Sequence, residues 1–266
     1  MVDKQALFVL GARDPEMREI ASVLAARDRP FVYAAKGQAP VTPRSAYDAN
    51  AVVQLGPSGR ARESVFPPHV PAVFVECSVE RREPAMRVDH HNPGDPGYAA
   101  PPERYLDGAS IGQTLRLLEM DASETHKLIA AADHCLTAAY RGACPGVDPA
   151  ELLFLRASWR ARVSDRSFGD VVEGILHAAK QVRRYYDSEF DESVFLDPTE
   201  VPTDLAEGAA YGGRPVRYRE LSRGGELKEM LKGAPPAHID RFMARHRREG
   251  REVYGNPYRG YAGAYL

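Results

Sequence analysis

The residues best suited to metal chemistry form the run Asp89-His90-His91, which follows a short apolar segment and leads into a turn at Asn92-Pro93-Gly94. Imidazole nitrogens bind Mn, Fe, Co, Ni or Zn, and an accompanying carboxylate favours harder ions such as Mn or Mg. In open α/β sheets, ligands bind at the carboxyl ends of the strands. The run therefore predicts a metal site at such an edge. Taken alone, it is equally well explained as a loop whose histidines bond to the backbone.

Two earlier strand ends also carry carboxylates. Phe8–Leu10 leads into Asp14 and Glu16, and Ala72–Val75 leads into Glu76. Because parallel strands end at the same edge of a sheet, we expect these acids to lie near the histidines. Two of these acids also have a simpler explanation, a helix cap for Asp14 and a solvated strand end for Glu76.

A further acid, Asp133, lies on the shoulder of the apolar stripe of an expected helix, Ser123–Tyr140. A carboxylate is costly there unless it is paired, hydrogen-bonded or bound to a metal. An ion pair with Arg104 or Arg141 is the alternative to a metal. The adjacent His134 is either a substrate contact or an ordinary surface histidine.

The elements that position these residues begin with short apolar runs that predict strands. These are Ala6–Leu10, Pro30–Ala34, Ala51–Leu55, Ala72–Val75 and Met86–Val88. Between the first two, Asp14-Pro15-Glu16 is typical of a helix start, with Asp as the cap and Pro at the first helical position. Strands that alternate with helices indicate βα units, so we expect an α/β fold with a mostly parallel sheet flanked by helices.

The rest of the chain is predicted to be helical and then mixed. Helices are expected at 109–120, 123–140, 148–163 and 167–186, a strand at 216–221, and helices near 226–232 and 237–248. A stretch rich in Pro, Gly and acids predicts a linker at 196–213. We therefore expect a domain of residues 1–195, this linker, and a small C-terminal α+β cap of residues 214–266.

Composition excludes several classes of protein. The 35 Lys and Arg residues nearly balance the 37 Asp and Glu residues, for a net charge of -2. The protein therefore has no overall positive charge with which to bind long duplex nucleic acid. The apolar run Ala6–Leu10 is too short for a membrane span, and no membrane partner is expected. The 3 cysteines show no CxxC spacing, which fits a reducing compartment, and we expect a cytoplasmic protein with small, buried cysteines.

The order of the motifs resembles the DHH phosphoesterase superfamily, which includes RecJ-type exonucleases, oligoribonucleases, cyclic dinucleotide phosphodiesterases and family II pyrophosphatases. The resemblance covers about residues 6–142 and extends to Tyr105-Leu106-Asp107-Gly108-Ala109-Ser110, which is similar to the helix start after the family's DHH strand. It implies a divalent-metal hydrolase, with two Mn²⁺ ions favoured and Mg²⁺ or Co²⁺ as alternatives.

The resemblance also implies a role for each residue. The implied metal ligands are Asp14, Glu16, Glu76, His90 and Asp133. Asp14 holds one ion, Glu16 the other, and Glu76 bridges the two. The implied catalytic pair is His91, which faces the scissile phosphate, and Asp89, which orients a histidine. Two neighbouring ions would activate water for in-line attack on phosphorus.

This sequence departs from the family pattern at three positions. Glu16 and Glu76 stand where the family commonly has Asp, and Leu10 stands where it has a His. One alternative is therefore a metal- or nucleotide-binding protein of this type without hydrolase activity. Another is a metal enzyme on the same scaffold whose chemistry does not involve a phosphate ester.

The expected substrate is a small nucleotide or other small phosphorylated molecule, since the charge balance disfavours long nucleic acids. Candidate substrate contacts are His91, His134, Arg13 and Arg259. Arg259 lies in the glycine-flanked run Tyr258-Arg259-Gly260, which is the nearest analogue of the family's substrate loop. A homodimer is compatible with the sequence.

Overall fold

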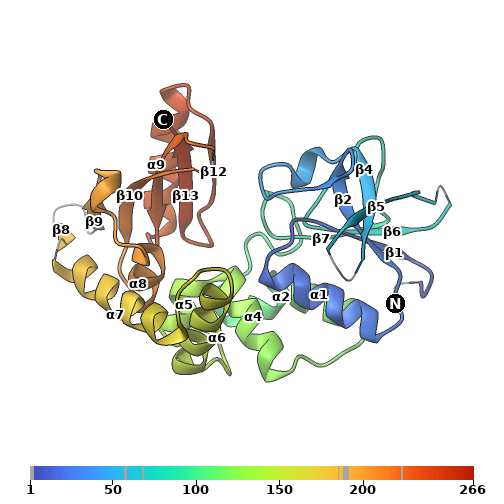
Figure 1. The fold of residues 1–266 in the computed structure, drawn as a ribbon, viewed down its shortest axis with the longest axis horizontal. Coiled ribbons are helices and arrows are strands. Elements are labelled where there is room, and N and C mark those ends of the chain that lie inside the picture. The colour runs from blue at the N-terminus through green and yellow to red at the C-terminus, as the bar shows by residue number, and fades with distance from the viewer. Residues whose placement is uncertain (1–2, 57–58, 68, 185, 188–191, 223) are drawn as a thin grey trace. The chain divides into compact units, whose positions relative to one another are not determined.

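The computed structural model describes residues 3–56, 59–67, 69–184, 186–187, 192–222 and 224–266 (Figure 1). These residues form two compact units. The first contains residues 1–100 and 104–133, and the second contains residues 101–103 and 134–266. The expected boundary at residue 195 differs from this division, which falls at the end of a helix because the long helices that follow pack with the C-terminal sheet.

The first unit is built on a mixed sheet. Among the described residues it has seven strands, in the order β5-β4-β2-β1-β6-β7, with β3 beside β2. The strands are β1 Leu7–Leu10, β2 Phe31–Lys36, β3 Ala39–Pro40, β4 Ala51–Leu55, β5 Ala61–Ser64, β6 Ala72–Val75 and β7 Met86–Val88. All the expected strands of this region are therefore present.

The expectation of a mostly parallel sheet is wrong. Strands β2, β1, β6 and β7 are parallel to one another, whereas β3 and β4 pair antiparallel with β2, and β5 pairs antiparallel with β4. The physical reason lies in the connections. No helix of crossover length separates β2 from β4 or β4 from β5, and short loops join strands in the antiparallel sense.

Helix α1 (Pro15–Ala26) covers one face of this sheet (Figure 1). Asp14 caps it as expected, because its side chain accepts a hydrogen bond from the backbone nitrogen of Met17 at 2.7 Å. Met17, Ile20 and Leu24 form its buried stripe. The opposite face is covered by the segment 41–49. Its small apolar side chains belong to the same hydrophobic core cluster as side chains of the strands.

The unit continues with short helices after β7. These are α2 Tyr105–Gly108 and α3 Ser110–Leu117, and α4 Glu124–His134 follows. Helix α3 packs against α1 and β7. The expected single helix 123–140 is interrupted at Cys135, whose non-helical backbone (φ -152°, ψ 50°) separates α4 from α5 (Leu136–Tyr140). No proline or glycine marks this break in the sequence.

The second unit encloses a six-stranded sheet, counted over the described residues, in the order β12-β13-β11-β10-β9-β8. Its strands are β8 Tyr186–Asp187, β9 Glu192–Phe195, β10 Val216–Leu221, β11 Leu227–Lys232, β12 Val253–Asn256 and β13 Tyr261–Tyr265. Its helices after α5 are α6 Pro149–Arg162, α7 Phe168–Arg184, α8 Leu205–Gly212 and α9 Pro236–Arg248. Helix α9 packs on one face, and α7 and α8 contribute to the core on the other.

Two expectations for this unit differ from the structure. The helix expected near 226–232 is strand β11, because its residues pair antiparallel with both β10 and β13. The expected linker 196–213 contains α8, whose buried side chains include Leu205 and Ala209. Alanine and acidic residues that resemble a solvated linker thus form a packed helix.

A buried ionic network joins α8 to α6. Arg156 lies 2.6 Å from Glu207, and Arg160 lies 2.6 Å from Asp204. Both carboxylates are 2% exposed, and Tyr140 also donates to Glu207, at 2.9 Å. Burial alone would raise the pKa of Glu207, but Arg156 lowers it below its usual value. The network therefore explains how α8 can bury acids.

No helix in the described part of the chain combines the length and the apolar character needed to cross a lipid bilayer.

Candidate metal centre

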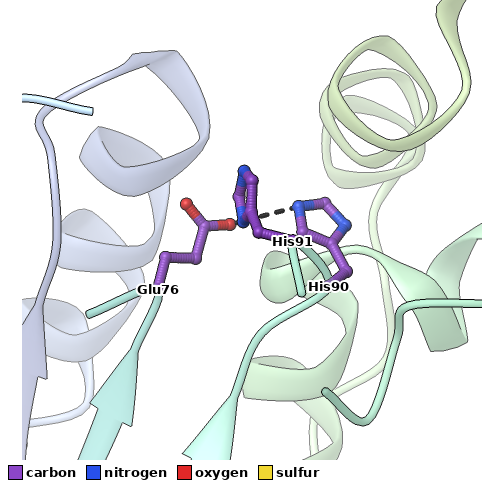
Figure 2. A group of neighbouring side chains, drawn as sticks. All are labelled: Glu76, His90 and His91. Carbon is purple, nitrogen blue, oxygen red and sulfur yellow. Dashed lines mark ion pairs between the residues drawn. The ribbon is translucent and has the colours of Figure 1, made fainter. Parts of the chain in front are cut away.

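Three parallel strands of the first unit end at one edge of the sheet and deliver the predicted acids and histidines. Strand β1 leads to α1 and Glu16, β6 leads to Glu76, and β7 leads to His90. Figure 2 shows Glu76 and His90 facing each other from neighbouring strand ends, with His91 beside them. The adjacent pairing of β1, β6 and β7 thus explains why these segments meet.

The backbone at Glu76 has an uncommon conformation. Its φ of 50° lies in the left-handed region, which non-glycine residues seldom adopt. Gly11 lies directly against it, because a Cβ atom at Gly11 would stand 2.4 Å from the Glu76 carbonyl oxygen. Such outliers cluster at functional sites. The close approach therefore leaves room only for glycine at position 11. It also fixes the point at which the Glu76 side chain leaves the backbone.

Four residues, which we call the four-residue cluster, place one ligand atom each within 4.8 Å of one another: Glu16, Glu76, His90 and Asp133. The Nε2 atom of His90 lies 3.3 Å from Glu76 Oε1 and 3.1 Å from Asp133 Oδ2. Glu16, Glu76 and His90 are buried, and Asp133 is half-buried. A second group with the same spacing comprises Glu76, His90 and His91.

Several carboxyl groups are crowded together in this region, and their pKa values shift in different directions. Burial, followed by the negative charges of Glu76 and Asp133, raises the pKa of Asp14 to about 8. Burial and the same neighbours raise the pKa of Glu16 well above its usual value. Burial would also raise the pKa of Glu76, but His91 and His90 lower it below the usual value. The site therefore concentrates acids that need a cation.

Asp89 lies beside the four-residue cluster and has a different role. It is 0% exposed, and its Oδ1 atom accepts hydrogen bonds from the backbone nitrogens of His90 (2.7 Å) and His91 (3.1 Å). The Nδ1 atom of His91 lies 3.0 Å from the same oxygen. Burial would raise the pKa of Asp89, but the hydrogen bond from His91 lowers it. Asp89 thus holds the turn that carries both histidines.

Tyr47 completes the surroundings of Asp89 and was not predicted from the sequence. Its hydroxyl lies 3.0 Å and 2.9 Å from the two carboxylate oxygens, and its ring meets His91 edge-on. Burial and the charge of Asp89 raise the pKa of Tyr47 above its usual value, so the hydroxyl remains a donor. The two residues are 42 positions apart, and no local pattern links them.

The remaining predicted site residues have other surroundings. Arg13 is exposed, with its guanidinium over the ring of Tyr33 at 5.7 Å. His134 is 1% exposed and belongs to the second unit, so it is not an ordinary surface histidine. Arg259 also belongs to that unit, where its guanidinium lies over the ring of Tyr261 at 5.4 Å.

The donors of the four-residue cluster fit a divalent cation. Among the described residues, Glu16 Oε2 is a buried oxygen without a hydrogen bond, while Glu16 Oε1 accepts one from the backbone nitrogen of Ile111 at 2.9 Å. An unsatisfied buried carboxylate oxygen is costly, and a metal ion removes that cost. Carboxylate oxygens and an imidazole nitrogen are donors that divalent metal ions take in proteins. The cluster can therefore hold a divalent metal.

Compared with known proteins, the chain matches no family model and no curated sequence.

Proposed function

We propose that this protein is a divalent-metal-dependent phosphohydrolase that acts on a small nucleotide or other small phosphorylated substrate. The observation that carries the proposal is the convergence of four ligand atoms within 4.8 Å at the ends of three parallel strands and on α4. The resemblance of the motif order to DHH phosphoesterases supplies the reaction class, a hydrolysis of a phosphodiester or phosphoanhydride.

Each residue then has a role. Glu16, Glu76, His90 and Asp133 would hold the metal, and Asp14, the cap of α1, would serve as a further ligand outside the four-residue cluster. Bound divalent ions would supply Lewis-acid activation of water and neutralisation of phosphoryl oxygens, and Mn²⁺ is the favoured ion. Asp89 orients His91, which is 30% exposed in its side chain and can reach a substrate phosphate.

Metal binding without hydrolysis is the second candidate, and one observation favours it. Leu10 is 0% exposed and offers no ligand at the position where DHH phosphoesterases have a histidine. An ion that loses a nitrogen ligand binds less tightly, and a site with a single ion lacks the paired activation of attacking and leaving oxygens.

Hydrolysis of bis(p-nitrophenyl) phosphate and of pyrophosphate by the full-length protein, with and without Mn²⁺, tests the proposal. Turnover should depend on Mn²⁺ and should fall at least a hundredfold in His91→Ala. Glu83→Gln is the matched control, because Glu83 is an exposed acid of the same unit and should leave turnover unchanged. Bound metal without turnover on either substrate would favour the second candidate.

A further inference from the structure

Cys135 and Cys144, two of the 3 cysteines, lie with their sulfur atoms 3.1 Å apart. Non-bonded carbon atoms pack about 3.5–4.0 Å apart, and sulfur is the larger atom, so these thiols are in unusually close contact. Both residues belong to the second unit. They are 6% and 2% exposed, respectively, and neither belongs to the four-residue cluster.

The local fold brings the two thiols together from defined positions. Cys135 is the cap residue at the joint between α4 and α5, and Cys144 lies in the turn between α5 and α6. That turn is closed by a hydrogen bond from the backbone nitrogen of Val147 to the carbonyl oxygen of Cys144 at 3.2 Å. Because the break between two helices and a hydrogen-bonded turn set the two positions, the contact is a feature of the local fold.

We propose that Cys135 and Cys144 form an oxidation site at which a hydroperoxide converts the two thiols into an intramolecular disulfide. The sulfur of Cys135, the more exposed of the two, attacks a peroxide oxygen. The O–O bond breaks, Cys135 becomes a sulfenic acid, and the other oxygen leaves as water or an alcohol. The sulfur of Cys144 then attacks Cys135, the S–S bond forms, and the S–O bond breaks with release of water.

This step is balanced and needs little movement. The two thiols lose two electrons and two protons, and the hydroperoxide takes up both. From 3.1 Å, the sulfur atoms must approach by about 1 Å to reach the usual disulfide bond length. Thiol reductants reverse the bond, which makes the site compatible with a reducing compartment. The inference does not depend on the proposed metal chemistry.

Cys77 provides an internal control. It lies in the first unit, whereas both other cysteines lie in the second. It is 0% exposed, and its thiol donates to the carbonyl oxygen of Val9 at 3.3 Å. A thiol with no exposed surface is out of reach of a peroxide in solution. It should therefore remain a thiol.

Peptide mapping of the full-length protein tests the site. Trypsin cleaves after Arg141, so Cys135 lies in the peptide 128–141 and Cys144 in 142–156. After hydrogen peroxide treatment, the remaining thiols are alkylated with iodoacetamide in denaturant before digestion. The two peptides should appear joined, about 2 Da lighter than their sum because oxidation removes two hydrogens, and should separate on reduction. The Cys77 peptide should remain fully alkylated.

Variants sharpen the test. Cys77→Ser should give the same joined peptide, and Cys144→Ser should abolish it and leave Cys135 as a sulfenic acid that dimedone traps. The wild-type map needs no variant, so a folding defect in Cys144→Ser does not weaken it. Full alkylation of Cys135 and Cys144 after peroxide, or oxidation of Cys77 to the same extent, would overturn the proposal.

Discussion

Replacing Tyr47 with Phe removes one hydroxyl and tests whether this group holds Asp89 in place. The hydroxyl lies within 3.0 Å of both carboxylate oxygens of a residue that is 0% exposed. Hydrogen bonds to charged groups contribute about 1.5–3 kcal/mol. Asp89 keeps its other donors, two backbone nitrogens and the His91 ring. We therefore expect Tyr47→Phe to lower the free energy of local opening of this turn by an amount near the lower limit of that range, about 1.5 kcal/mol.

Hydrogen–deuterium exchange measures this loss where it occurs. The backbone amides of His90 and His91 donate to Asp89, and a loss of 1.5 kcal/mol corresponds to about tenfold faster exchange when the turn opens locally. Tyr33→Phe is the matched control, since it removes a hydroxyl from another buried tyrosine of the same unit. Metal content should be unchanged in Tyr47→Phe. Unchanged exchange at both amides would refute the assigned role of the hydroxyl.

Four further variants test the two histidines, the close packing at Gly112 and the ionic network around Glu207. His90→Ala should lower metal content, measured by elemental analysis, whereas His91→Ala should keep most of the metal and lose turnover; equal loss of metal in both would contradict this division. Gly112→Ala should destabilise the protein by about 3 kcal/mol in thermal unfolding, because the new Cβ would lie 1.9 Å from a backbone carbonyl oxygen. Arg156→Met should cost about 3 kcal/mol at pH 7, because Glu207 is left buried with fewer cations. Since the folded-state pKa of Glu207 is lowered, this stabilisation is present above the usual carboxyl pKa and is lost as the pH falls, so the cost should shrink in acid; a cost independent of pH would refute it.

The central strands and the cap of α1 were predictable because their signals are local. Each apolar run is short, continuous and bounded by turn residues, and Asp14-Pro15 marks a helix start. The antiparallel half of the sheet was not predictable, because strand direction depends on which strands pair. Strand β11 was mistaken for a helix because its residues, Leu227–Lys232, favour helices in isolation. Tertiary pairing with β10 and β13 overrides that preference.

In the candidate site, too, the residues with a local sequence signal were predictable and those without one were not. Glu16, Glu76 and His90 were predictable because each follows a strand of a parallel set. Asp133 was predictable as a costly acid on an apolar helix face. Tyr47 gave no signal, since its contact with Asp89 spans 42 positions and depends on how the loop 41–49 covers the sheet.

We expect the four-residue cluster to hold a divalent cation. Equilibrium dialysis of the full-length protein against Mn²⁺, followed by elemental analysis, tests it most directly in three proteins: the wild type, the double variant Glu76→Gln/Asp133→Asn, and the control Glu83→Gln. We expect stoichiometric Mn²⁺ in the wild type and the control, and loss of most of it in the double variant. Equal Mn²⁺ in all three proteins, or none in the folded wild type, would contradict it.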